Sequence, residues 1–274
     1  RHEGKIIISM PGVPYEMKAI KSEIVLPMIK STSSIKICHK TILTACTGET
    51  TIENMISDIV TSMPPYIKVA YLPAIASVRV RISGTGSDEA KLNDEIQHYT
   101  QLISQKLGDI VYGYDETSLE QEILKLAIQK NIKISTAESC TGGAIASRLV
   151  TVPGSSAYYM GSIVAYDNAV KHNLLHVPEA TISSNGAVSE ETVKAMVIGA
   201  NQALQSDVSI GVTGIAGPDG GTPEKPVGHI WICVGNKDIQ ETFLLKAGKN
   251  RLKNIETTTF YSLDMLRKFI LKEY

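Results

Sequence analysis

The spacing of apolar residues along the chain predicts two successive α/β units. In the first unit, apolar residues at every second position indicate strands, and apolar residues three or four positions apart indicate helices. Strands are expected at 35–45, 67–71, 77–83 and 110–112, and helices at 49–60 and 88–107. This pattern predicts a small α+β domain at 31–113.

The second unit alternates strands with helices along its whole length. Strands are expected at 132–136, 159–166, 208–213, 228–234 and 239–245, and helices at 119–129, after Gly143, from Asn168, at 189–204 and up to residue 270. Such alternation is typical of a sheet that helices cover on both faces. The pattern therefore predicts a three-layer α/β/α domain at 114–274.

The residues before position 31 do not complete a unit of their own. A strand-like run at 5–9 leads into a Pro-Gly-Val-Pro loop, and apolar residues on one face predict a helix at 15–28. A chain that opens without methionine and almost inside a strand is expected to be the C-terminal part of a longer protein. Residues 1–30 are therefore interpreted as the remnant of a preceding domain.

Strict alternation within 77–82 places Arg79 and Arg81 on the face of their strand opposite to the apolar residues. These arginines could form a stripe that binds phosphate groups. The simpler interpretation is that they lie on the solvated face of an antiparallel sheet.

Composition narrows the classes of function. The 274 residues are 43% hydrophobic and 20% charged, which is typical of a globular protein and argues against long disorder. The net charge of -1 leaves no large basic field, so nucleic acid is an improbable partner. No apolar run reaches the roughly 18 residues of a membrane helix. Four cysteines without a Cys-x-x-Cys pair indicate reduced thiols, and a cytoplasmic protein is expected.

The segment 136–143 carries the clearest chemical pattern. A strand leads to Ser139, and two glycines then open a helix, so that free amides of residues 140–143 are expected beside the serine. This arrangement suits a nucleophile and an oxyanion, although Ser139 could also be a simple helix cap. Cys140 is a rival nucleophile, because thiol pKa values fall at helix N-termini.

Lys171 is a candidate base. If Asn168 caps the next helix, Lys171 lies in its first turn, where the helix dipole disfavours a cation. A free lysine has a pKa of about 10.4, so burial and neighbouring dipoles would have to lower the pKa of Lys171 substantially for it to act as a base at neutral pH. The alternative is an ordinary surface lysine.

Residues 212–221 form a glycine-rich loop after a buried strand, which would let the backbone approach a ligand closely. The loop lacks the phosphate-binding pattern of P-loop proteins. His172 and His176 could share a helix face as metal ligands, but no carboxylate or cysteine accompanies them at ligand spacing. Neither a metal nor a cofactor is therefore expected.

Four segments together resemble the competence/damage-inducible family, CinA. They lie at 136–143, at 161–171 with its Tyr-x-Asn-x-x-Lys ending, at 185–189, and at 213–221 with a trailing Glu-Lys-Pro-Val-Gly. The resemblance implies that 31–113 is the KH-like middle domain of that family and that 1–30 ends a molybdopterin-binding-like domain. The metal-dependent ADP-ribose pyrophosphatase activity of that N-terminal domain is not expected from so short a remnant.

The resemblance also implies a function, because the C-terminal domain of that family is similar to nicotinamide-nucleotide amidases. These convert nicotinamide mononucleotide and water to nicotinic acid mononucleotide and ammonia. Ser139 would be the nucleophile, Lys171 its base, Tyr166 part of the proton network and Thr213 part of the pocket. Substrate contacts would come from Cys140, Thr141, Gly142, Gly143, Asn168, Gly214, Gly217, Pro218, Asp219, Gly220 and Arg251.

One departure concerns Arg251, which lies one position later than the Gly-Asp-Arg of many relatives, in Gly-Lys-Asn-Arg. A homodimer is expected. The alternative to the amidase is a non-catalytic module that binds nucleotides or a competence-related partner.

Overall fold

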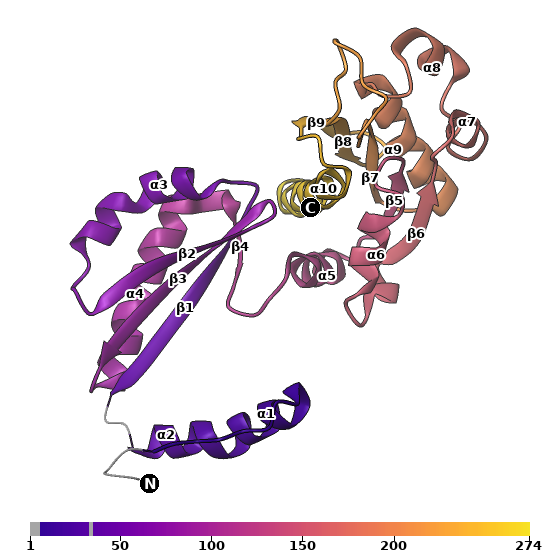
Figure 1. Cartoon of the computed structure of the whole chain (residues 1–274). Coiled ribbons are helices and arrows are strands. Elements are labelled where there is room, and N and C mark those ends of the chain that lie inside the picture. The colour runs from indigo at the N-terminus through magenta and orange to yellow at the C-terminus, as the bar shows by residue number, and fades with distance from the viewer. Residues whose placement is uncertain (1–5, 33–34) are drawn as a thin grey trace.

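The computed structural model describes residues 6–32 and 35–274 (Figure 1). The N-terminal part is one continuous helical segment made of α1 (Pro14–Ile20), the π-turn η1 (Lys21–Val25) and α2 (Leu26–Thr32). The helix expected at 15–28 is confirmed. The strand expected at 5–9 is wrong for residues 6–9, and Lys5 lies outside the described residues. Ile7 is 80% exposed, and within residues 6–32 and 35–274 this run joins no sheet.

The first α/β unit contains a four-stranded antiparallel sheet. Its elements are β1 (Lys36–Ala45), α3 (Glu49–Ser62), β2 (Ile67–Ala74), β3 (Ser77–Gly86), α4 (Glu89–Leu107), η2 (Gly108–Ile110) and β4 (Val111–Tyr114). The strand order is β2-β3-β1-β4. Ile42, Val80 and Ile82 form a core with Ile56 of α3 and Ile103 of α4. Arg79 and Arg81 are exposed between these buried β3 residues, as the alternation predicted.

The second unit contains a mixed five-stranded sheet. Its elements are α5 (Leu119–Lys130), β5 (Ile134–Glu138), α6 (Ala144–Val150), η3 (Ser155–Ala157), β6 (Tyr159–Val164), α7 (Asn168–Leu175), α8 (Glu179–Asn185), α9 (Glu190–Leu204), β7 (Val208–Gly214), β8 (His229–Gly235), β9 (Gln240–Lys246) and α10 (Arg251–Glu273). The order is β6-β5-β7-β8-β9. Strands β6, β5 and β7 are parallel to one another. Strand β8 is antiparallel to β7, and β9 is antiparallel to β8. Helix α8 was not predicted, because it buries no residue and so has no apolar period.

Helices lie against both faces of this sheet. Val208, Ile210 and Val212 of β7 belong to the same core cluster as residues of α5 and α10. The intervening Gly211 faces α9, where a Cβ would lie 2.7 Å from Val197. Alternate residues of one strand therefore pack against opposite helical layers, and α9 approaches so closely that only glycine fits there.

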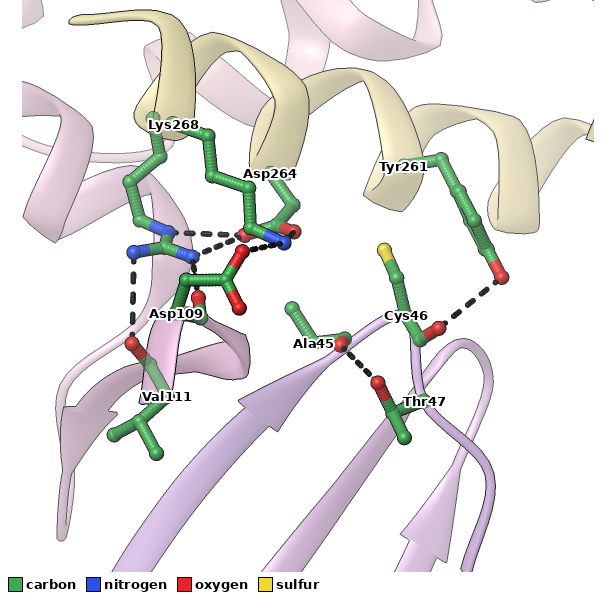
Figure 2. A network of polar contacts seen from close by, with 9 residues as sticks. Ala45, Cys46, Thr47, Asp109, Val111, Tyr261, Asp264 and Lys268 are labelled. Carbon is green, nitrogen blue, oxygen red and sulfur yellow. Dashed lines mark hydrogen bonds and ion pairs between the residues drawn. The ribbon is translucent and has the colours of Figure 1, made fainter. Parts of the chain in front are cut away.

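Helix α10 also joins the two units through a polar network (Figure 2). The buried Asp264 accepts hydrogen bonds from Arg267, whose guanidinium donates at 2.6 Å to the carbonyl of Asp109 in the first unit. Lys268 pairs with the Asp109 carboxylate at 3.1 Å. Burial, reinforced by Asp264, raises the pKa of the Cys46 thiol in this interface. The same helix reaches the candidate site at its other end through Arg251.

Candidate active site

The carboxyl end of β5 is the point where the chain reverses its direction of travel across the sheet. From β5 the chain moves to β6 on one side and then crosses to β7 on the other. Ligands of open α/β sheets bind at such switch points, outside the carboxyl ends of the strands. Ser139 follows β5 directly, Tyr166 follows β6, and Thr213 lies at the end of β7.

Ser139 and Lys171 are in hydrogen-bond contact at this point. The Lys171 Nζ lies 3.3 Å from the Ser139 Oγ, although 32 residues separate them in the chain. The same Nζ donates to the Tyr166 carbonyl oxygen at 3.2 Å. Ser139 is 8% exposed and Lys171 is 2% exposed. When the Lys171 amine is neutral, it can donate one hydrogen to the Tyr166 carbonyl. The lone pair of the amine nitrogen is then free to accept the proton of the Ser139 hydroxyl.

Burial lowers the pKa of Lys171, and the negative charge of Asp167 opposes this effect. The expected helix cap is wrong, because Asp167 and not Asn168 caps α7, accepting the Ala169 amide at 2.8 Å. Asn168 is the exposed first residue of the helix. A charged cap favours the protonated lysine, so it is burial that shifts Lys171 towards the neutral form of a base.

Glu138, a residue that sequence reasoning missed, binds the start of α6. Its fully buried carboxylate accepts the amides of Gly143 and Ile145 at 3.1 Å each and that of Ala146 at 2.8 Å. The Gly142 amide donates to the Ser139 carbonyl at 3.1 Å. The expectation of free amides is therefore wrong for Gly142 and Gly143. An acidic residue at the end of a buried strand, just before the glycines, was the available clue.

In the described part of the chain, the amides of Cys140 and Thr141 donate no hydrogen bond to another residue. The Thr141 hydroxyl is buried and also lacks a partner among the described residues. These two amides are thus the donors left beside Ser139 for an anionic oxygen. Burial raises the pKa of Cys140 to about 12, contrary to the expected lowering, because the thiol is enclosed by the protein.

Arg251 lies at the rim of the site, at the start of α10. Its guanidinium donates to the Gly217 carbonyl at 2.7 Å and to the Tyr166 hydroxyl at 3.1 Å. The Tyr166 side chain is 61% exposed. The backbone carbonyl of Tyr166, and not its hydroxyl, contacts Lys171. Arg251 retains further N–H groups that could bind an anion.

Thr213 and Lys225 hold the loop that precedes α9. The buried Thr213 hydroxyl donates to the Ala187 carbonyl at 2.7 Å. The Lys225 Nζ donates to the carbonyls of Asn185 and Val188, both at 2.8 Å. Lys225 was not singled out from the sequence, although it lies in the Glu-Lys-Pro-Val-Gly stretch. Both side chains fix neighbouring loops to each other beside the site.

The glycine-rich loop is only partly close to Ser139 and Lys171. A Cβ on Gly214 would lie 2.6 Å from the Ile230 side chain, so packing alone requires this glycine. Gly217 is buried, with a φ of 89° that favours glycine. Pro218, Asp219 and Gly220 are exposed, and within the described ranges no hydrogen bond joins them to Ser139 or Lys171.

Among residues 6–32 and 35–274, no three His, Cys, Asp or Glu side chains lie together as a metal site. His172 instead places Nδ1 at 3.0 Å from the Val177 carbonyl. In the same ranges, no helix is both long and apolar enough to cross a membrane.

Two family models match the chain. The model for the CinA C-terminal domain matches residues 116–270, and the model for the Damage-inducible protein CinA KH domain matches residues 39–113. The assignment of residues 1–30 to a molybdopterin-binding-like domain stays a prediction.

Known proteins align with the chain over most of its length. A CinA-like protein of Cytophaga hutchinsonii is 41% identical over 266 residues, which cover 97% of this chain and 64% of that protein. A CinA-like protein of Amoebophilus asiaticus is 37% identical over 269 residues, which cover 98% of this chain and 65% of that protein. The chain thus spans just under two thirds of the length of these relatives.

Solved structures resemble about half of the chain. A competence/damage inducible protein of Agrobacterium tumefaciens is 35% identical with a TM-score of 0.53, covering 54% of this chain and 91% of its own. A competence damage-inducible protein of Klebsiella pneumoniae is 29% identical with a TM-score of 0.55, covering 57% of this chain and 97% of its own.

Proposed function

The chain belongs to the CinA family, and from that premise we propose that its C-terminal domain hydrolyses the carboxamide of nicotinamide mononucleotide through Ser139 and Lys171. One observation carries the proposal, namely the 3.3 Å contact between a buried lysine Nζ and a buried serine Oγ at the switch point of the sheet. A buried amine whose pKa is lowered is a suitable base for a serine nucleophile.

In the first step, neutral Lys171 takes the hydroxyl proton as the Ser139 Oγ attacks the carboxamide carbon. The oxygen of the resulting tetrahedral species carries negative charge, which the free amides of Cys140 and Thr141 can stabilise. The protonated lysine then gives its proton to the nitrogen, the C–N bond breaks, and ammonia leaves. An ester of Ser139 with the nicotinic acid nucleotide remains.

In the second step, water hydrolyses this ester. Lys171 is neutral again after ammonia has left, so it can accept a proton from the attacking water. The ester bond to the Ser139 Oγ breaks, and the serine recovers its proton from Lys171. Nicotinic acid mononucleotide is released, and no metal or cofactor takes part in this sequence.

Arg251 is the candidate partner for the phosphate of the substrate. It lies at the rim and is held by the Gly217 carbonyl and the Tyr166 hydroxyl, which orient the guanidinium without neutralising its charge. A guanidinium suits phosphate because its planar N–H groups can bind two oxygens together.

The test is ammonia release from nicotinamide mononucleotide by the purified chain. Ser139→Ala and Lys171→Met should each abolish turnover, while Ser147→Ala, a serine of α6 outside the dyad, should leave it unchanged. Tight nucleotide binding without ammonia release would favour the non-catalytic module instead. Equal activity of the parent and Ser139→Ala would refute the serine mechanism.

A further inference from the structure

Glu138 is a buried carboxylate that none of these chemical steps uses. Its side chain is fully buried and forms no ion pair with any described lysine or arginine. Three backbone amides of the α6 N-terminus donate to it instead, Gly143 and Ile145 to Oε2 and Ala146 to Oε1, and the Thr136 hydroxyl donates to Oε1 at 3.4 Å. A carboxylate is favoured there because the amides at a helix start carry partial positive charge. Burying an unpaired charge is costly, so these three bonds must be well formed in the folded state.

The backbone of Glu138 is bonded on the other side of the site. Its carbonyl accepts the Ala165 amide at 2.8 Å. Ala165 directly precedes Tyr166, whose carbonyl accepts the Lys171 Nζ. Glu138 therefore contacts both the turn that carries Ser139 and the segment that holds Lys171.

We propose that Glu138 is a positioning residue, whose carboxylate ties the first amides of α6 to the end of β5 and thereby keeps Ser139 within reach of Lys171. The proposal rests on the amidase function proposed above. The residues between Glu138 and Gly143 form a tight turn, in which the Gly142 amide donates a hydrogen bond to the Ser139 carbonyl at 3.1 Å. Fixing both ends of so short a turn leaves Ser139 little freedom to move.

A second consequence concerns where a substrate anion can bind. The N-terminus of a helix is otherwise a ready site for phosphate or carboxylate groups. Here Glu138 occupies the amides of Gly143, Ile145 and Ala146 with its own negative charge. The α6 terminus is therefore closed to the substrate phosphate, and among the described residues of this turn the amides of Cys140 and Thr141 remain for the reacting oxygen.

The decisive variant is Glu138→Gln, which keeps the size of the side chain. The NH₂ group of glutamine cannot accept a hydrogen bond, so at least one of the backbone amides that donate to the carboxylate would face another donor and lose its hydrogen bond. We expect kcat to fall by about tenfold to a hundredfold, because displacements near 1 Å reduce catalysis on that order. KM should change by less than about threefold, since the rim that binds the nucleotide is untouched. Glu138→Asp keeps the charge but shortens the reach, and it should act in the same direction.

Glu120→Gln is the matched control. Glu120 is also nearly fully buried, at 3% exposure, and it too binds α6, but through Arg148 near the C-terminal end of that helix. This control should lose stability without losing kcat. Equal kcat in Glu138→Gln, Glu120→Gln and the parent would overturn the proposal.

Two measurements do not depend on turnover. The first is the rate at which a sulfonyl fluoride labels Ser139, which should fall in Glu138→Gln and not in Glu120→Gln. An unchanged labelling rate in folded Glu138→Gln would mean a purely structural role. A parent that releases no ammonia would defeat the amidase proposal while this labelling still tests Glu138.

The second measurement is amide hydrogen exchange in the parent protein. The amides of Gly143, Ile145 and Ala146 should exchange slowly, because each is bonded to Glu138. Fast exchange at these positions would overturn the proposal even if no Glu138 variant folds.

Discussion

Replacing Asp167 by asparagine removes one negative charge beside Lys171 while keeping the helix cap. The Asp167 side chain accepts the Ala169 amide at 2.8 Å, and asparagine caps helices about as well as aspartate does. In the parent, the Asp167 charge raises the pKa of Lys171 against the larger lowering by burial. Asp167→Asn should therefore lower the Lys171 pKa further, and so favour the neutral amine that acts as the base.

The size of the effect follows from the exposure of Asp167. Water screens exposed charge pairs, which contribute about 0.2–1 kcal/mol. This free energy is smaller than the roughly 1.4 kcal/mol that corresponds to one pKa unit, so the Lys171 pKa should fall only modestly. The acid limb of kcat/KM reports the protonation of the free enzyme, and it should move to lower pH by the same amount. On that limb, the rate at a given pH should rise up to about threefold.

The assay is ammonia release against pH, at low and at high ionic strength. Because salt screens the exposed carboxylate, the difference between Asp167→Asn and the parent should shrink at high ionic strength. Glu179→Gln removes a similarly exposed carboxylate that contacts His172 instead, and it should leave the limb in place. An acid limb that stays fixed or moves upward in Asp167→Asn would refute the assignment of Lys171 as the base.

Three further outcomes are expected. Lys171→Met should be inactive yet raise the free energy of unfolding at pH 7, because the folded chain binds a proton at Lys171 less readily than the unfolded chain does. Urea titrations should show this gain shrinking as the pH rises from the lowered folded pKa towards the unfolded lysine pKa of about 10.4, and a loss of stability at pH 7 would contradict it. Arg251→Ala should raise KM for the nucleotide by about tenfold or more with kcat within about threefold, since a charged hydrogen bond contributes roughly 1.5–3 kcal/mol. Steady-state kinetics with the dephosphorylated nucleoside as the comparison substrate should show no such change in KM. Cys140→Ala should keep kcat within about threefold, because burial holds the thiol protonated, whereas a loss of a hundredfold would make the cysteine a participant.

Local patterns along the chain were sufficient for most helices and strands. Alternation in 77–82 correctly separated the buried Val80 from the exposed Arg79 and Arg81, because the side chains of a strand alternate by geometry alone. The same reasoning failed where no sheet or core enforces a pattern. The run at 6–9 forms no strand, and α8 has no buried residue that could reveal it.

The candidate site divides in the same way. Ser139 before two glycines and Lys171 in a short helix could both be identified from the sequence, as could the alternative that each is an ordinary cap or surface residue. Their 3.3 Å contact could not be derived from spacing, since it depends on how β5, β6 and α7 are placed by the crossover of the chain. The bonds of Glu138 depend on how α6 turns back towards the end of β5, which spacing does not give. The true cap, Asp167, lies next to Asn168, and aspartate and asparagine cap helices about equally well, so the sequence did not distinguish them.

The sequence by itself determined most of the strands and helices, that the chain is globular, and which motifs stand at the ends of strands. Those properties depend on short-range geometry and on the removal of apolar side chains from water. The tertiary structure alone decided which strand ends meet, which amides stay free beside Ser139, and in which direction the pKa values of the site shift. Burial raises the pKa of Cys140 and lowers that of Lys171, and desolvation of this kind exists only once distant segments enclose the site.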